Sequence, residues 1–295
     1  MDGASLGPSH AHRTVVGCIK FARIHEVRSS SNNRRVVYTA VFGNYDHLPP
    51  VNLAWSCDFI CFTDSRTLVS PGWKVIVCEL NGESPAQANR RYKILAHEYL
   101  ADYELSLYID ANIRILLDPN SLFTKYLQHG IIAIPKHQDR DCAYEEARTC
   151  IMRGLVNTEI TARQMERYAI NGFPKKSGMT ENGIIFRNHN ERAVTELMNH
   201  WWQEYCNGGR RDQLSLPYLI WKHNVAVQEV VEGPRITALY FSIQLHASDK
   251  LKSPMMRLAR IANGRKHLAF HYLVISLMVS AVINLRNDIR EKFLR

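Results

Sequence analysis

The stretch ELSLYIDANIRILLDP, from Glu104 to Pro119, decides how the rest of the chain is interpreted. Its first half is an almost continuous apolar run, which is typical of a β-strand covered on both faces. Asp110 and Asn112 follow this run two residues apart, so in extended chain their side chains project to the same side. Carboxylate and amide oxygens are ligands that a hard divalent cation prefers. The pattern therefore indicates a metal site, although Asp-x-Asn after a strand is also typical of a simple turn.

Further apolar runs on both sides of this stretch predict strands, and helical periodicity appears between them. We expect strands at residues 36–42, 58–64, 73–78, 130–135 and 184–187, and helices at residues 87–100, 161–168 and 191–205. Strands that alternate with helices predict an α/β fold with a mostly parallel, twisted sheet flanked by helices. Ligands of such folds bind beyond the carboxyl ends of the strands. Asp46, Asp64, Asp110 and Asn112 would collect at that edge.

A basic group lies on the expected helix that precedes the strand ending at Asp110. It contains Arg90, Arg91 and Lys93. These side chains form either a solvated helix face or a clamp on a diphosphate, whose charge suits arginine forks. The residues alone leave both interpretations open.

A loop dense in histidine and carboxylates follows the expected strand at residues 130–135. His137, Asp139 and Asp141 lie in this loop. One interpretation is a second metal site, as in a metal-dependent hydrolase. The other is a substrate loop in which Asp141 caps a helix that runs to Val156.

The composition is that of an ordinary globular protein with an excess of basic residues. The 295 residues carry a formal net charge of +9, and 46% of them are hydrophobic. This charge suggests an anionic partner such as a nucleotide phosphate or a membrane surface. Nucleic acid is not expected, because no recognisable motif interleaves aromatic and basic residues. A basic binding module without catalysis stays open as an alternative to an enzyme.

Cysteine usage and the amino-terminal segment both bear on the cellular compartment. The seven cysteines are scattered without the paired spacing of a zinc module, and we interpret them as reduced thiols. Residues 1–12 lack the basic-then-apolar pattern of a signal peptide. Residues 1–35 are rich in polar side chains and predict a flexible tail. A cytoplasmic protein is therefore expected.

The carboxyl-terminal residues 251–295 predict a basic, apolar helical tail. Residues 267–285 are apolar around most of a helix, and Lys and Arg side chains cluster between residues 250 and 295. Basic flanks suit a helix that lies on anionic lipid, as a peripheral protein at the inner face of the membrane. The alternatives are packing against the preceding domain or a second copy of the chain, and a helix that spans the bilayer.

Several motifs together resemble one known pattern. They are YTAVFGNYD (Tyr38–Asp46), CDFICFTD (Cys57–Asp64), NRRYK (Asn89–Lys93), YIDAN (Tyr108–Asn112), KHQDRDCAYEE (Lys136–Glu146) and RDQLSLP (Arg211–Pro217). The pattern resembles the TOD/MUCI-type glycosyltransferase-like family. That family is itself similar to the GT-A nucleotide-sugar transferases of the glycogenin and lipopolysaccharide galactosyltransferase kind. The likeness spans residues 36–250.

The resemblance implies a GT-A-like domain that binds a nucleotide sugar, expected to be a uridine diphosphate sugar. The acceptor would be a glycan or a lipid-linked molecule. Asp110 and Asn112 stand at the positions of the family's Asp-x-Asp motif, which holds Mn²⁺ or Mg²⁺ on the donor diphosphate, and His246 matches a third ligand. Asn112 departs from the motif, because it replaces the second aspartate and removes one negative charge.

The resemblance also implies which residues contact the donor sugar. Asp212 and Gln213 resemble the pair that lies beneath the donor sugar in the retaining relatives. In an inverting reaction, Asp212 or Glu181 would instead act as the general base, and both outcomes stay open. Donor binding is further expected of Thr39, Phe42, Asn44, Tyr45, Asp64, Arg90, Arg91, Lys93, His137 and Lys250.

Overall fold

The fold is seen in a computed structural model that describes residues 34–250 and 252–293. The flexible tail predicted for residues 1–35 lies outside the described residues except at its end, where the first strand begins at Arg35. Side chains are described up to Val282, except those of Ser248, Lys250 and Ser280.

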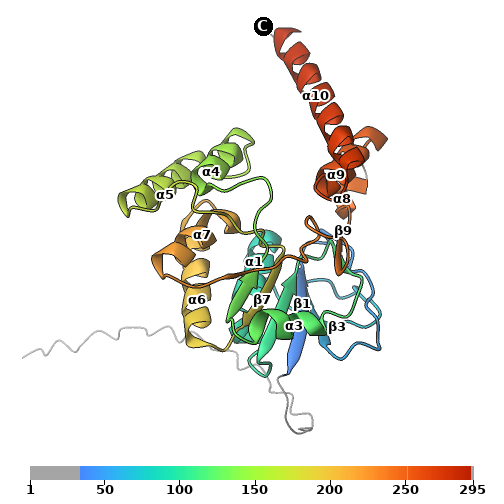
Figure 1. Ribbon diagram of the computed structural model, residues 1–295, viewed down its shortest axis with the longest axis vertical. Coiled ribbons are helices and arrows are strands. Elements are labelled where there is room, and N and C mark those ends of the chain that lie inside the picture. Colours follow the sequence, from blue (N-terminus) through green and yellow to red (C-terminus); the bar gives the residue numbers. More distant parts are fainter. Residues whose placement is uncertain (1–33, 251, 294–295) are drawn as a thin grey trace, which may run out of the picture. The chain divides into compact units, whose positions relative to one another are not determined.

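A mixed sheet of seven strands forms the centre of the described part. The strands are β1 (Arg35–Val41), β2 (Asp58–Thr63), β3 (Lys74–Val77), β4 (Leu105–Ile109), β6 (Ile132–Ile134), β7 (Ile184–Asn188) and β8 (Gln228–Glu229). Their order across the sheet is β3-β2-β1-β4-β7-β6-β8. Figure 1 labels β1, β3 and β7 of this sheet. Neighbours pair in parallel except at β7, which is antiparallel to both β4 and β6. The predicted α/β class with a mostly parallel sheet is confirmed.

The reversed strand β7 enters the sheet from the edge at which β1, β2 and β4 end. Ile109, the last residue of β4, pairs with Ile184, the first residue of β7. One residue further, the amide of Asp110 donates to the carbonyl of Gly183 at 2.9 Å. The segment before β7 therefore lies directly beside the segment that follows β4.

Alternate residues of β1 point into two different hydrophobic cores, as the two-residue period of a strand requires. Val36, Tyr38 and Ala40 join one core with residues of α1, α6 and α7. Val37 and Val41 join the other core, which includes residues of α3. Helices thus cover both faces of the central strand, which explains why its sequence is almost wholly apolar.

The helices are α1 (Pro85–Ile94), α2 (Ala96–Tyr99), α3 (Asn120–Leu127), α4 (Ala143–Met152), α5 (Thr158–Ile170), α6 (Arg192–Asn207), α7 (Asp212–Lys222), α8 (Ala247–Lys250), α9 (Pro254–Arg265) and α10 (Phe270–Phe293). The helix predicted over residues 87–100 is divided at Leu95, whose ψ of 45° is not helical. The helix predicted to run to Val156 ends at Met152. Its N-cap is Cys142, without a side-chain cap bond, so the predicted Asp141 cap is wrong.

A second, two-stranded sheet brings distant parts of the chain together. It pairs β5 (Ile113–Ile115) with β9 (Phe241–Ile243) in antiparallel register. Beyond this sheet, the amide of Gln244 donates to the carbonyl of Asn112 at 2.7 Å. The pairing places the segment after β9 beside the end of the loop that follows β4.

The predicted helical tail forms α9 and α10, which pack on one another. Among the described residues, no helix has the length and apolar character required to cross a membrane.

Candidate functional site

Helix α1 carries Lys93 into the protein interior and fixes it there. Lys93 is only 2% exposed. Its carbonyl accepts hydrogen bonds from Tyr38 at 2.8 Å and from the buried Arg187 at 2.9 Å, and Arg187 also donates to the carbonyl of Ile94. The last carbonyls of a helix lack partners within the helix, and a cation suits the negative end of its dipole. Arg187 thus stabilises the end of α1 and positions Lys93.

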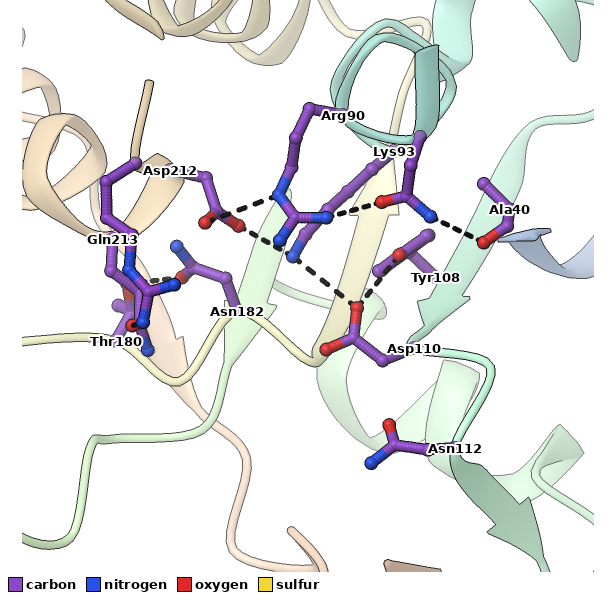
Figure 2. Close-up of polar contacts among 12 residues, drawn as sticks. Ala40, Arg90, Lys93, Tyr108, Asp110, Asn112, Thr180, Asn182, Asp212 and Gln213 are labelled. Carbon is purple, nitrogen blue, oxygen red and sulfur yellow. Dashed lines mark hydrogen bonds and ion pairs between the residues drawn. The ribbon is translucent and has the colours of Figure 1, made fainter. Parts of the chain in front are cut away.

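The ammonium of Lys93 lies between two carboxylates from different elements (Figure 2). Its Nζ is 2.8 Å from Asp212 Oδ2 and 3.6 Å from Asp110 Oδ1. It also lies 5.0 Å from the centre of the Tyr108 ring, within range of a cation–π attraction. A buried ammonium needs such partners, because its desolvation is costly. Lys93 therefore joins α1, β4 and α7 in one charged cluster.

A tight glycine loop sets the position of Asp212 at the start of α7. A Cβ on Gly208 would meet the side chain of Gln164 at 2.5 Å, and one on Gly209 would meet Thr161 at 2.4 Å. The amide of Gly209 donates to Gln164 at 2.9 Å, and Trp201 Nε1 donates to the carbonyl of Asp212 at 3.0 Å. The two glycines let this loop lie close to α5, and the bonds of Gly209 and Asp212 hold the start of α7 there.

Asp212 is a buried carboxylate that two cations hold in its ionised form. Arg90 Nε lies 3.4 Å from its Oδ1, opposite the Lys93 contact. Burial alone would raise the pKa of the Asp212 carboxyl, but the charges of Arg90 and Lys93 outweigh burial and hold that pKa well below its usual value. The same pairing with Asp212 raises the pKa of Arg90. The group is thus a permanent negative charge at neutral pH.

Asp110 is the most open member of the cluster. Its side chain is 40% exposed, and Oδ1 accepts a hydrogen bond from the Tyr108 hydroxyl at 2.9 Å. Burial, followed by the charge of Asp110, raises the pKa of that hydroxyl far above its usual value, so it stays a donor. The second oxygen, Oδ2, lies beside Gly183, where a Cβ would come within 3.1 Å. The absence of a side chain at Gly183 keeps that side of the carboxylate clear.

Asn112 and His246 meet at the end of the small sheet, as the sequence predicts for a shared site. Asn112 Nδ2 lies 3.4 Å from His246 Nε2. On its other side, His246 Nδ1 lies 2.8 Å from Asp46 Oδ2. This bond to Asp46 is the main reason why the pKa of His246 is raised. Tyr45 flanks the imidazole, with its ring centre 5.1 Å from that of His246.

Asp110, Asn112 and His246 offer donor atoms of the kinds that a divalent cation takes. Asp110 offers Oδ2 and His246 offers Nε2. Asn112 turns its Nδ2 toward His246 and toward the carbonyl of Gln244 at 3.3 Å, so half a turn of the amide, which gives up the contact with Gln244, would present its oxygen. A carboxylate on the far nitrogen of a ligating imidazole, here Asp46, is the usual orienting contact of a metal histidine. No three His, Cys, Asp or Glu side chains of the described residues converge as metal ligands. A cation here would therefore rely on the Asn112 amide and on phosphate oxygens of a ligand.

Asn182 also lies at this site, although no sequence motif predicts a role for it. It comes from the segment before β7, and Figure 2 shows it between Asp212 and the loop of Thr180. It is 2% exposed, and its Oδ1 accepts from the Thr180 hydroxyl at 2.7 Å. Its Nδ2 has no hydrogen-bond partner within the described chain. An unpaired buried donor is costly, and a ligand or water bound at the site would satisfy it.

Gln213 and Glu181 lie at the border of the cluster. Gln213 Oε1 accepts from Arg211 at 3.3 Å. Glu181 forms an ion pair with Arg235, a short contact through Nε. Neither side chain contacts Asp110 or Lys93 in the part of the chain that the structure describes.

The predicted donor residues of the first strand and its loop separate into buried and exposed groups. Thr39 and Phe42 are buried in the sheet, and Phe42 stacks on Tyr92 at 5.3 Å between ring centres. Asn44 is exposed and has a positive φ of 52° in the turn after β1. The carboxylate of Asp64 accepts from the amide of Gly43 at 3.0 Å and so fixes this turn.

Other predicted donor residues lie outside the charged cluster. Arg91 pairs with Glu83 at 2.9 Å, and no ion pair of the described residues joins it to Asp110 or Asp212. The amide of Asp139 donates to His137 Nδ1, and burial lowers the pKa of His137. The side chain of Lys250 is outside the described atoms, so its role stays a prediction.

The alternative site of His137, Asp139 and Asp141 is not assembled as a metal centre in the described structure. Asp139 lies 2.8 Å from Lys266 and 2.9 Å from His267 of the tail segment. Asp141 is exposed. Through these contacts Asp139 holds the turn between α9 and α10 and does not join a metal centre in the described structure.

Known proteins resemble this chain at the level of one family model and of weakly similar solved structures. A family model described as "TOD1/MUCI70, glycosyltransferase-like domain" matches residues 22–232. No curated protein matches the chain. Among solved structures, apo mouse xyloside xylosyltransferase 1 has 10% identity and a TM-score of 0.39, covering 67% of this chain and 84% of that one. The mannosyltransferase Ktr4p from S. cerevisiae has 8% identity and a TM-score of 0.36, covering 63% and 64%.

Proposed function

Because the chain belongs to the TOD1/MUCI70 glycosyltransferase-like domain family, we propose that it transfers a sugar from a nucleotide sugar to a glycan or lipid-linked acceptor. The observation that carries this proposal is the bridge from Lys93 to both Asp212 and Asp110. It joins a carboxylate suited to sugar hydroxyls with a carboxylate suited to a cation–diphosphate complex. We further propose a uridine diphosphate sugar as the donor.

Asp110, Asn112 and His246 would hold Mn²⁺ or Mg²⁺ in this reaction. The ion would neutralise negative charge that develops on the departing nucleoside diphosphate. Tyr108 and Lys93 hold Oδ1 of Asp110 and so orient its free oxygen Oδ2. This preorganisation lets the carboxylate serve without rearrangement when the donor arrives. The proposed Lys250 contact with the diphosphate would add a further positive charge.

Asp212, Asn182 and Gln213 would bind the transferred sugar. A fully ionised carboxylate accepts strong hydrogen bonds from hydroxyl groups, and Asp212 is held in that state by Arg90 and Lys93. The unpaired Nδ2 of Asn182 supplies a donor on the same side of the site. A hydroxyl group that both donates and accepts can satisfy both residues at once.

Neither candidate carboxylate is suited to act as a general base. A base works best when its pKa lies near the operating pH. The pKa of Asp212 is held far below that range by its two cations, and Glu181 is engaged by Arg235. We therefore propose that both carboxylates bind and position groups, and that neither abstracts the acceptor proton.

A thermal-shift screen tests the proposed donor class. The full chain is melted with uridine, guanosine, adenosine and cytidine diphosphate sugars, each with Mn²⁺, with Mg²⁺ and with a chelator. A ligand present at about 100 times its Kd stabilises a protein by about 2.7 kcal/mol, which gives a measurable rise in Tm. A rise with a uridine diphosphate sugar that the chelator removes supports the proposal. No rise with any donor under any condition contradicts it.

A further inference from the structure

Helices α9 and α10 present large apolar side chains to the solvent. The side chains that are more than one-third exposed are Met255, Met256, Leu258, Phe270, Leu273, Leu277, Met278 and Val282. We call this set the tail surface. Exposed apolar side chains that gather in one stretch indicate an interaction site more strongly than single ones do.

The apolar residues of α10 lie on a defined side of that helix. Phe270, Leu273 and Leu277 are spaced by three and four residues, so they share one face. Phe270 is 79% exposed and Leu277 is 61% exposed. Ser276 is buried, and Tyr272, Val274, Ile275 and Val279 are half-buried. Phe270 and Leu277 remain uncovered by the described part of the chain.

The charge around the tail surface is predominantly positive. Between Asp249 and Asp288 the sequence contains no Asp or Glu. The basic residues of that interval are Lys250, Lys252, Arg257, Arg260, Arg265, Lys266 and Arg286. Asp249 pairs with Lys252 and Arg260, and Asp139 pairs with Lys266, so acids offset only part of this charge. Arg257 is exposed and makes no ion pair with any other residue that the structure describes. An apolar face whose surroundings carry an excess of cations complements a surface that is anionic outside and apolar beneath.

We propose that the tail surface docks on the headgroup layer of an anionic lipid bilayer. Its apolar side chains would enter the boundary between headgroups and acyl chains, and the arginines and lysines would face the lipid phosphates and carboxylates. A second protein copy would cover the apolar side chains equally well, but it would bring the same cations into contact with its own. The excess of positive charge therefore favours lipid. The docking does not depend on the proposed sugar transfer.

Vesicle co-sedimentation of the full chain tests this proposal. Phosphatidylcholine vesicles are compared with vesicles that also contain phosphatidylserine. The protein should sediment with the anionic vesicles and much less with the neutral ones. Binding should weaken as salt rises from about 0.15 M to about 1 M, because screening shortens the range of the attraction. Equal binding to both vesicle types, or binding to neither, overturns the proposal.

The double variant Phe270→Glu/Leu277→Glu tests the residues directly. It should bind anionic vesicles at least about tenfold more weakly, because two apolar insertions are lost. The control variant Leu53→Glu/Val69→Glu makes the same charge change at apolar residues that are 81% and 84% exposed, and it should bind like wild type. If both variants bind equally, the tail surface is not the lipid site.

Binding by a third variant and light scattering of the full chain complete the test of the tail surface. If the double variant fails to fold, Arg257→Ala should still lower binding to anionic vesicles by about fivefold, as expected for one cation near the surface. Light scattering of the full chain separates lipid from a second copy as the occupant. The proposal is overturned in favour of self-association by two results together. The wild-type chain does not bind anionic vesicles, and it forms a dimer that dissociates in the variant Phe270→Glu/Leu277→Glu.

Discussion

The ammonium of Lys93 lies 2.8 Å from the carboxylate of Asp212, although 119 residues separate the two in sequence. Both groups are buried, and Asp110 extends the contact toward the open edge of the sheet. A site that depends on this contact forms only when α1, β4 and α7 are all in place. Its geometry is therefore coupled to the stability of the domain core.

Replacing Lys93 by Met should destabilise the protein and weaken its site. Asp212 would keep only Arg90 as a cationic partner, and breaking a buried ion pair costs about 3 kcal/mol or more. The free energy of unfolding, measured in urea, should fall by that order. The double variant Lys93→Met/Asp212→Asn should lose less than the sum of the two single variants, by about 2 kcal/mol. Simple additivity would show that the pair is not coupled.

Asn182→Ala should separate activity from stability. Because Nδ2 of Asn182 is buried without a partner, its removal relieves a desolvation cost that offsets the lost bond with Thr180. We expect a change in unfolding free energy of less than about 1 kcal/mol. Transfer should fall by about tenfold or more if the amide binds the sugar. A large loss of stability with unchanged turnover would assign Asn182 to the fold alone.

Stability should fall on mild acidification because of His189. This residue is buried and lies 2.9 Å from the carbonyl of Leu100, and burial lowers its pKa to about 4. In the unfolded chain this histidine has a pKa of about 6.5. The stabilisation that neutral, buried His189 contributes is therefore fully present above that pH, and it is lost as the pH falls toward 4. Between pH 7 and pH 5 the loss should be about 2 kcal/mol.

Urea unfolding of wild type and His189→Gln at the two pH values measures this contribution. Glutamine can donate to the same carbonyl but does not titrate in this range. The variant should therefore lose less stability than wild type between pH 7 and pH 5. An equal loss in both proteins would place the acid sensitivity elsewhere in the chain.

The sequence predicts the sheet well because its strands are locally encoded. The run before Asp110 is apolar on both faces, and Val36 to Val41 alternates between two cores that are both apolar. The same locality explains the prediction that Asp46, Asp110 and Asn112 lie at one edge, since parallel strands end together. His246 is also brought to Asn112, through the pairing of β5 with β9.

Other features depend on information that a periodic pattern does not contain. The reversal of β7 brings Asn182 and Gly183 to the site, and strand direction leaves no mark in apolar periodicity. Arg90 and Arg91 are neighbours in sequence, yet helical geometry turns one toward Asp212 and the other toward Glu83. The burial of Lys93 follows from the way Arg187 holds the end of α1. The Glu-Asn-Gly turn (Glu181–Gly183) before an apolar strand was the available signal for Asn182.

The account is tested most directly by the release of nucleoside diphosphate from a uridine diphosphate sugar, with Mn²⁺ present, by wild type and by Asp110→Ala. Asp102→Ala is a matched control, because this exposed aspartate precedes β4 at the opposite edge of the sheet. We predict turnover by wild type and the control, and a loss of at least about 100-fold in Asp110→Ala, which should still unfold in one cooperative transition. Turnover by Asp110→Ala at the wild-type rate would contradict the account.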